Sequence, residues 1–164
     1  MIAAHPVLEA FSPAVREWFA ASFPEPTPPQ VQGWPHIAAG EHTLICAPTG
    51  SGKTLTAFLA SIDRLTTTPR PEERSHRTRV LYISPLRALA FDIEKNLRAP
   101  LKGIELAAER LGPASVSEFV APDVGMRTGD TAANDRQKLI RRPPDLLITT
   151  PESLYLMLTS SARE

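Results

Sequence analysis

One stretch of the chain has residue types and spacing suited to binding phosphate. It runs from Ala47 to Thr54 and reads Ala-Pro-Thr-Gly-Ser-Gly-Lys-Thr. Gly50 and Gly52 permit a tight turn whose backbone N–H groups come close to an anion, at the positive end of the helix that follows. Lys53 is predicted to reach the β- and γ-phosphates of a nucleotide, and the Thr54 hydroxyl to coordinate Mg²⁺. The sequence therefore predicts a P-loop that holds the phosphates of a nucleotide such as ATP.

The residues of this loop that are expected to bind the nucleotide are Thr49, Gly50, Ser51, Gly52, Lys53 and Thr54. Lys53 and Thr54 are also expected to act in catalysis, because phosphoryl transfer depends on positive charge placed at the phosphates. The usual motif begins with glycine, and Ala47 takes that place here. The competing interpretation is an ordinary glycine turn. An apolar run before the loop and a helical pattern after it argue against that interpretation.

The elements that would position the loop alternate between strand and helix. Short apolar runs predict strands at residues 43–47, 80–84, 124–127 and 146–149. Apolar residues at helical spacing predict helices at residues 7–23, 30–39, 55–65, 86–97, 101–111 and 132–141, and from Pro151 onward. We expect Pro100 to separate two helices in tandem, and residues 66–78 to form a surface loop. Cys46, at the end of an apolar run, is interpreted as a core residue.

This alternation indicates the fold class. Strands that are apolar along their whole length are typical of a parallel sheet that is covered on both sides. We therefore predict an α/β fold of the P-loop NTPase type, a parallel sheet with helices on both faces, preceded by N-terminal helices.

Composition bounds the function less tightly. The chain has 164 residues, 42% of them hydrophobic, and its 18 basic residues balance its 18 acidic ones. This balance neither predicts nor excludes a nucleic-acid partner. A single cysteine rules out an internal disulfide, and the four histidines show no metal-ligand spacing. No window is long and apolar enough to span a membrane and the first residues do not form a leader, so a cytoplasmic protein without a membrane partner is expected.

Five motifs in order resemble those of superfamily 2 helicases. The loop itself resembles motif I, and the segment from Phe23 to Gln30 resembles the Q motif. The further motifs are Ser84-Pro85-Leu86-Arg87-Ala88-Leu89-Ala90, similar to motif Ia, Arg127-Thr128-Gly129-Asp130-Thr131, similar to motif Ib, and Thr149-Thr150-Pro151-Glu152-Ser153-Leu154. Together with Leu156-Met157-Leu158-Thr159-Ser160, the combination most resembles the Lhr (large helicase-related) family of ATP-dependent helicases.

The resemblance implies a RecA-like fold, ATP and Mg²⁺ as cofactors, and an enzyme that hydrolyses ATP. It also implies 3′-to-5′ translocation on single-stranded DNA and unwinding of DNA or RNA–DNA duplexes, with a role in DNA repair. Gln30 would read the adenine edge, since an amide offers both a donor and an acceptor. The residues that would contact nucleic acid are Pro85, Arg87, Thr128, Gly129, Thr150 and Pro151.

Several of these residues also have a simpler interpretation. Gln30 could be a first-turn helix residue, and Phe23 is expected to pack rather than to stack on a base. Arg87 could be a solvated charge, and Thr128 and Thr150 could cap helices, although a well-capped helix start also offers N–H groups to a phosphate. Asp130 is expected to be a cap or turn former. The basic cluster at Arg136, Lys138, Arg141 and Arg142 is expected to be solvated surface.

The sequence contains no adjacent Asp-Glu pair, which the resemblance would place at the end of a further strand. We therefore expect an N-terminal fragment, with residues 1–29 as a helical segment and Pro-rich linker and residues 30–164 as an incomplete first RecA-like domain. Alone, it should bind nucleotide weakly and hydrolyse almost none. Two alternatives stay open, a P-loop phosphotransferase and a non-catalytic module that binds nucleotide and nucleic acid. The oligomeric state is left open.

Overall fold

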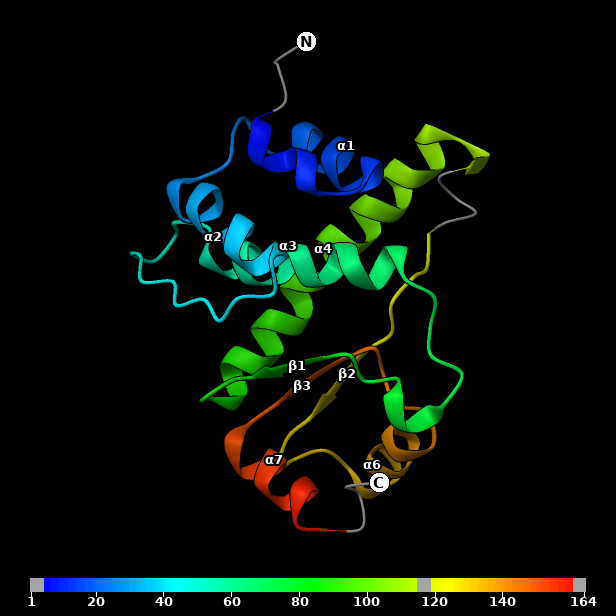
Figure 1. Cartoon of the computed structure of the whole chain (residues 1–164). Coiled ribbons are helices and arrows are strands. Elements are labelled where there is room, and N and C mark those ends of the chain that lie inside the picture. The colour runs from blue at the N-terminus through cyan, green and yellow to red at the C-terminus, as the bar shows by residue number, and fades with distance from the viewer. Residues whose placement is uncertain (1–4, 115–118, 161–164) are drawn as a thin grey trace. The chain divides into compact units, whose positions relative to one another are not determined.

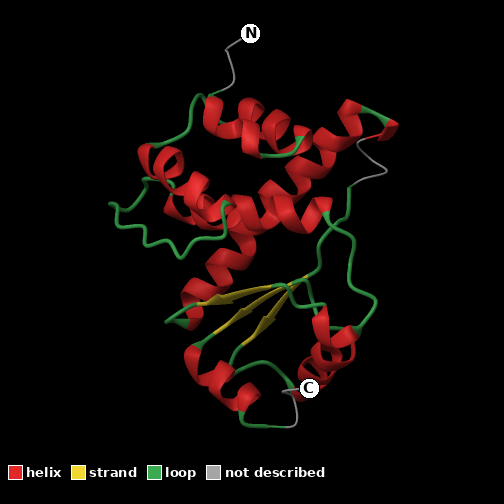
Figure 2. Cartoon of the chain, in the orientation of Figure 1, coloured by secondary structure: helices red, strands yellow, loops and turns green. Residues whose placement is uncertain are grey.

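The computed structural model describes residues 5–114 and 119–160. The chain forms two compact units, one from Met1–Thr67 with Lys102–Phe119 and the other from Thr68–Leu101 with Val120–Glu164. Figure 1 follows the chain by residue number, and Figure 2 separates helices from strands. The predicted domain boundary between residues 29 and 30 coincides with neither unit's bounds and stays a prediction. Residues 1–4 and 161–164, on which the expectations about a leader and about the chain end rest, lie outside the described residues.

The first unit is helical in its described part. It contains the 3₁₀-helix η1 (Pro6–Ala10), α1 (Pro13–Ser22), α2 (Pro28–Ala38) and α3 (Lys53–Thr67). The pattern at residues 7–23 had predicted one helix, but the Ser12 side chain accepts a hydrogen bond from Val15 N and caps the start of α1. Because proline follows at the first helical position, the chain begins a new helix there.

Trp34 of α2 lies at the centre of the core of the first unit. Its indole meets Phe11 and Phe19 edge-on, with ring centroids 5.0 and 5.6 Å apart. Its Nε1 donates a hydrogen bond to the carbonyl of Thr56 in α3, 3.2 Å away. The adjacent Gly33 brings the two helices close, since a Cβ there would lie only 2.9 Å from Thr56 Cγ2. Tight packing of α2 on α3 therefore fixes the position of α3, whose first two residues, Lys53 and Thr54, belong to the phosphate loop.

The prediction of a buried strand at residues 43–47 was wrong. The segment from Glu41 to Pro48 has no regular structure, Leu44 is 88% exposed, and Cys46 is exposed rather than in the core. A strand is stable only when neighbouring strands satisfy its backbone groups. The described part of the first unit contains no strand that could pair with this segment. The apolar residues at 43–47 therefore suggested a strand, but the described part of the same unit offers no strand with which they could pair.

The second unit contains a three-stranded parallel sheet. Its strands are β1 (Val80–Ile83), β2 (Val124–Arg127) and β3 (Leu146–Thr149), in the order β1-β3-β2. Ile83 and Arg127, the last residues of the outer strands, both pair with Thr149, the last residue of β3. The three strands therefore end level with one another. The short 3₁₀-helix η2 (Arg74–His76) lies within the segment predicted as a loop.

One helix, α4 (Arg87–Leu111), replaces the two predicted helices. Pro100 lies inside it and costs one backbone hydrogen bond. The buried positions nonetheless continue through the proline at helical spacing, at Ala90, Ile93, Leu97, Pro100, Ile104, Ala107 and Ala108. Because burial of this continuous apolar stripe offsets the lost hydrogen bond, the helix is not interrupted. Its first part belongs to the second unit and the part from Lys102 belongs to the first.

Two more helices, α6 (Ala133–Arg141) and α7 (Pro151–Leu158), complete the second unit. The chain passes from β1 to β2 through α4 and returns from β2 to β3 through α6, so the two connections cross the sheet in opposite directions. Right-handed connections then place α4 and α6 on opposite faces. A Cβ at Gly125 of β2 would meet Leu139 of α6 at 2.8 Å, so α6 packs on the face of the sheet toward which Gly125 points. The predicted parallel sheet with helices on both faces is confirmed.

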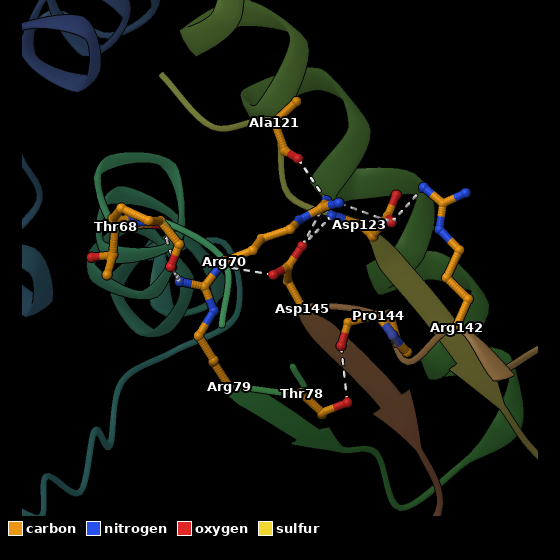
Figure 3. A network of polar contacts seen from close by, with 10 residues as sticks. Thr68, Arg70, Thr78, Arg79, Ala121, Asp123, Arg142, Pro144 and Asp145 are labelled. Carbon is orange, nitrogen blue, oxygen red and sulfur yellow. Dashed lines mark hydrogen bonds and ion pairs between the residues drawn. The ribbon is translucent and has the colours of Figure 1, made fainter. Parts of the chain in front are cut away.

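Charged residues directly precede all three strands, and Figure 3 shows the network that they form. Asp145, before β3, is 2% exposed and lies between Arg79, before β1, and Asp123, before β2. Its carboxylate oxygens lie 2.7 Å from the Arg79 guanidinium and 2.8 Å from that of Arg70, and one of them also accepts from Asp123 N. Arg142 and Arg70 both pair with Asp123. Ion pairs therefore join the segments that lead into the three strands.

None of the helices among the described residues is long and apolar enough to cross a membrane.

Candidate functional site

The phosphate loop takes the backbone shape that its glycines permit. Gly50 and Gly52 have φ angles of +79° and +86°, a region that other residues rarely adopt. The loop is solvent-accessible from Pro48 to Thr54, and the Ser51 hydroxyl donates to the carbonyl of Pro48 at 2.7 Å. α3 begins at once after Gly52, so its first N–H groups, which have no acceptor within the helix, open beside the loop. This geometry fits the phosphates of a nucleotide.

Lys53 and Thr54 occupy the first turn of α3. The Lys53 ammonium donates hydrogen bonds to the carbonyl oxygens of Ala47 and Pro48, the latter at 2.5 Å, so the side chain arches back over the loop. The Thr54 side chain is exposed at the same turn. A cation and a hydroxyl therefore border the loop from which the helix starts, which is the arrangement that the sequence predicted for them.

Gln30 lies against the loop but is not open to solvent. It is 3% exposed, and its side-chain oxygen accepts a hydrogen bond from Thr27 N at 2.9 Å, closing a capping box at the start of α2. A Cβ on Gly52 would lie 2.8 Å from Gln30 Nε2 and 3.0 Å from Thr27 Oγ1. The Thr27 hydroxyl also donates to the Ser51 carbonyl at 2.9 Å. Gln30 and Thr27 thus support the loop from behind, a role that sequence reasoning missed.

A hollow of about 640 Å³ opens beside the loop, within the first unit. Its walls come from the start of α2 and from the irregular segment before the loop, and they include Pro28, Pro29, Gln32, His36, Ile45 and Pro48. The buried Gln30 is not among the lining residues. The assignment of Gln30 to adenine stays a prediction, and Gln32 is the glutamine that reaches this hollow.

The carboxyl edge of the sheet, in the second unit, brings together three of the other motifs. Because the strands are parallel and end level, the residues after each strand meet at this edge: Ser84 after β1, Thr128 after β2 and Thr150 after β3. All three are buried. Ser84 N donates to the carbonyl of Thr149 at 2.8 Å, and the Thr149 hydroxyl donates to the carbonyl of Arg127 at 2.7 Å. Hydrogen bonds therefore join the three segments across the edge.

Arg87 connects two of these segments. Its guanidinium forms an ion pair with Asp130 at 2.5 Å, although Asp130 was expected only to cap or to form a turn. The guanidinium lies over Gly129, where a Cβ would come within 2.9 Å of Arg87 Nη2. On the other side, Arg136 donates to the Gly129 carbonyl at 2.7 Å. The prediction that Arg136 is solvated surface was wrong, since it is half-buried and holds this turn.

The third segment begins α7. The Thr150 hydroxyl accepts from Ser153 N at 3.4 Å, as the sequence predicted for a cap, and Pro151 opens the helix. The pKa of the neighbouring Glu152 lies below its usual range because it accepts hydrogen bonds from its own backbone N–H and from the Thr150 hydroxyl, with a smaller contribution from the charge of Arg87.

Arg127, the last residue of β2, is a further cation near this edge. Partial burial, and secondarily the charge of Arg136, lower the pKa of its guanidinium. It lines an apolar hollow on the opposite side of the sheet from Met126, together with Leu81 and Leu147. Arg87, in contrast, forms the ion pair that joins the segments after β1 and β2 at the carboxyl edge. Pro85, Gly129 and Pro151 are exposed at the same edge.

Known proteins resemble this chain closely. The family model of the DEAD/DEAH box helicases matches residues 27–164. The Lhr helicase/probable uracil glycosylase of Mycolicibacterium smegmatis is 56% identical over 96% of this chain, and the Lhr helicase/uracil glycosylase of Escherichia coli is 53% identical over 95%. The ATP-dependent helicase Lhr-Core of Methanocaldococcus jannaschii is 44% identical over 94%. The chain spans 10% of the length of each bacterial relative and 18% of the archaeal one.

Solved structures agree with this relationship. The Mycobacterium smegmatis helicase Lhr, in a structure bound to ssDNA and AMP-PNP, superposes with a TM-score of 0.86 and 52% identity, over 97% of this chain and 19% of that one. The yeast DEAD-box splicing factor Prp28 superposes with a TM-score of 0.68 at 20% identity, over 96% of this chain and 34% of that one, and shows the shared fold. The fold is RecA-like, and the chain belongs to the DEAD/DEAH box helicase family, with the Lhr helicases as its relatives.

Proposed function

We propose that this chain is the ATP-binding part of an Lhr-type helicase that moves along single-stranded DNA. The observation that carries the proposal is the gathering of the segments after β1, β2 and β3 at one edge of the sheet, with Arg87 among them. A phosphotransferase would share the phosphate loop but would need no contact with nucleic acid at this edge. The solved relative bound to ssDNA and AMP-PNP supports both ligands.

ATP is held at the phosphate loop in this proposal. The backbone of Thr49 to Gly52 and the first turn of α3 surround the phosphates, and Lys53 leaves the carbonyls of Ala47 and Pro48 to pair with them. The exposed Thr54 hydroxyl supplies one ligand to Mg²⁺. Gln30 selects adenine by turning its amide, which offers both a donor and an acceptor, toward the base.

Nucleic acid is held at the carboxyl edge. Thr128 and Thr150 are buried and engaged in hydrogen bonds, so they shape the backbone that faces a phosphate. The exposed groups beside them, at Pro85, Arg87, Gly129 and Pro151, make the direct contacts. Neutral composition is compatible with this role, since a few cations at one edge suffice to hold a strand in register.

The wider activity belongs to a longer protein in this proposal. Its relatives are about ten times as long as this chain or, in the archaeal case, more than five times. ATP hydrolysis, 3′-to-5′ movement and unwinding of DNA or RNA–DNA duplexes depend on groups outside the present sequence, which has no adjacent Asp-Glu pair. The proposal also includes a role in DNA repair, which the resemblance implies, and a cytoplasmic location. In this proposal the chain alone binds nucleotide and nucleic acid without hydrolysing ATP. Residues 30–164 form part of the first RecA-like domain.

The test of the nucleotide site is a Lys53→Ala substitution, with binding of a fluorescent ATP analogue and Mg²⁺ as the readout. We expect the affinity to fall roughly tenfold or more, since a charge-assisted hydrogen bond to phosphate contributes about 1.5–3 kcal/mol. Lys102→Ala is the matched control, because Lys102 is an exposed lysine of the same unit that pairs with Glu105. Equal affinity of the Lys53 variant and the wild type would refute the site.

A second test separates the helicase from the phosphotransferase. Gln30→Glu keeps the oxygen that accepts from Thr27 N but removes the amide donor. We expect the preference for ATP over GTP to be lost in this variant and kept in Gln32→Glu. Unchanged selectivity in the Gln30 variant would count against adenine recognition by Gln30. Loss of selectivity in the Gln32 variant alone would assign adenine recognition to the hollow that Gln32 lines.

A further inference from the structure

We propose that Phe91 is a base-stacking residue for the single strand, in a groove that continues from the Arg87 site. The inference rests on the proposed function and adds a contact with a base to the contacts with phosphates. The groove lies within the second unit and has a volume of about 720 Å³, and its lining includes residues of α4, of α6 and of β2. Its lining shares Thr128 and Asp130 with the carboxyl edge.

The position of Phe91 on α4 is the first argument. It follows Arg87 by four residues, so the two side chains lie on the same face of the helix, one turn apart. Phe91 is 46% exposed and lines the groove. Phe91 takes no part in the ring pairs that Phe11, Trp18, Phe19, Phe23 and Trp34 form in the first unit. An exposed ring next to a phosphate-binding arginine is the pairing that single-strand binding proteins use.

The charges of the groove are the second argument. Three carboxylates line it, and each is paired with a cation: Asp130 with Arg87 at 2.5 Å, Glu94 with Arg98 at 2.6 Å, and Asp135 with Lys138 at 2.8 Å. These charges balance when Arg87 is counted, although Arg87 pairs with Asp130 from outside the lining, so the groove offers no net attraction to a phosphate. Phe91, Met126 and Leu139 add apolar surface to the same lining. Such a surface fits the flat, uncharged face of a base and leaves the phosphate to Arg87.

The proposed arrangement predicts which part of the strand each residue senses. Arg87 contacts the backbone, so its contribution depends on salt and not on the presence of a base. Phe91 contacts a base, so its contribution disappears when the base is removed. Stacking tolerates every base because each has a π-face, so a preference for one sequence is not expected from this contact.

The experiment compares two fluorescent oligonucleotides of equal length, an oligothymidylate and a strand of abasic sites, by anisotropy at low salt. Phe91→Ala should weaken binding of the oligothymidylate roughly five- to a hundredfold and leave binding of the abasic strand unchanged. Phe91→Leu keeps apolar volume without a ring and should lose most of the same affinity, whereas Phe91→Trp should retain it. Leu89→Ala, another exposed apolar residue of α4, is the control and should change neither affinity.

The outcomes separate the two proposals. If the wild type binds neither strand, the nucleic-acid function and the stacking role both fail. If Arg87→Ala weakens binding but Phe91→Ala does not, the function stands and the stacking role is overturned. Equal losses for both strands in the Phe91→Ala variant would also overturn it, because a base contact cannot act on a strand without bases. A circular dichroism spectrum like that of the wild type establishes that each variant is folded.

Discussion

Asp130 and Arg87, which are 43 residues apart in the sequence, form an ion pair at 2.5 Å across the carboxyl edge of the sheet. Both side chains are more than half exposed, at 67% and 56%, so the pair contributes little to stability. It does set the direction of the guanidinium, and it puts a negative charge beside the group that is proposed to meet a phosphate. Asp130 therefore both orients Arg87 and competes with the strand for it.

The competition predicts opposite effects of two substitutions. Arg87→Ala should weaken binding of single-stranded DNA and lower the slope of log affinity against log salt by about one. Asp130→Asn should tighten binding at low salt by roughly two- to fivefold, because it removes a charge several ångströms from the phosphate. Asp92→Asn, an exposed acid of the same helix outside the groove lining, is the control. Weaker binding by the Asp130 variant would show that orientation, and not competition, dominates.

A substitution at Gly52 tests the support of the phosphate loop. Gly52→Ala would force a Cβ into a backbone with φ of +86° and against Gln30 and Thr27. We expect nucleotide affinity to fall roughly tenfold or more and stability to fall by about 1–2 kcal/mol. Gly40→Ala is the matched control, since Gly40 also has a positive φ, of 76°, but nothing lies within 4 Å of its Cβ position. The Gly40→Ala variant should be less stable than the wild type but should bind nucleotide with unchanged affinity. Equal nucleotide affinity in the two variants would contradict the assigned contact.

The ion-pair network at the start of the sheet makes a prediction about stability. Asp145→Asn leaves Arg70 and Arg79 facing a neutral group where a buried carboxylate had joined them. Because both arginines keep partial access to water, we expect the free energy of unfolding, measured in urea, to fall by about 2–3 kcal/mol. This is somewhat less than the loss expected when a fully buried ion pair is broken. Asp123→Asn, at a half-exposed carboxylate of the same network, should lose less. A smaller loss for Asp145 than for Asp123 would contradict its central position.

The pH dependence of stability should respond to Asp63. Burial raises the pKa of the Asp63 carboxyl above its ordinary value of 3.8, against the hydrogen bonds from Ser12 and the charge of Arg16. The folded state thus holds this proton more tightly than the unfolded state, so the stabilisation is fully present below 3.8 and is lost as the pH rises through the folded pKa. Asp63→Asn cannot ionise but can still accept from Ser12 N. We expect its stability relative to the wild type to increase with pH over this range in thermal unfolding. A difference that does not change with pH would refute this.

The local elements were largely predictable because their signals are local. Thr150 and Pro151 start α7 as predicted, and the helical stripe after Lys53 predicted α3, whereas the helix start at Ser12 and Pro13 was missed. The strands at residues 80–83, 124–127 and 146–149 were predicted for the same reason. The prediction failed at residues 43–47, because an apolar run becomes a strand only beside a partner. It failed again at Pro100, where burial of neighbouring turns keeps one helix continuous.

The residue types of the candidate site were visible in the sequence, since Gly50 and Gly52 are the residues that a positive φ requires, and Lys53 and Arg87 carry the charge that a phosphate requires. Their partners were not. Pairing of Asp130 with Arg87, the contact of Gln30 with Gly52 and the burial of Asp145 join segments that lie far apart along the chain. Periodicity and motif spacing report neighbours in sequence. Only the order and the level ends of three parallel strands, and the packing of α2 on α3, decide which distant side chains meet.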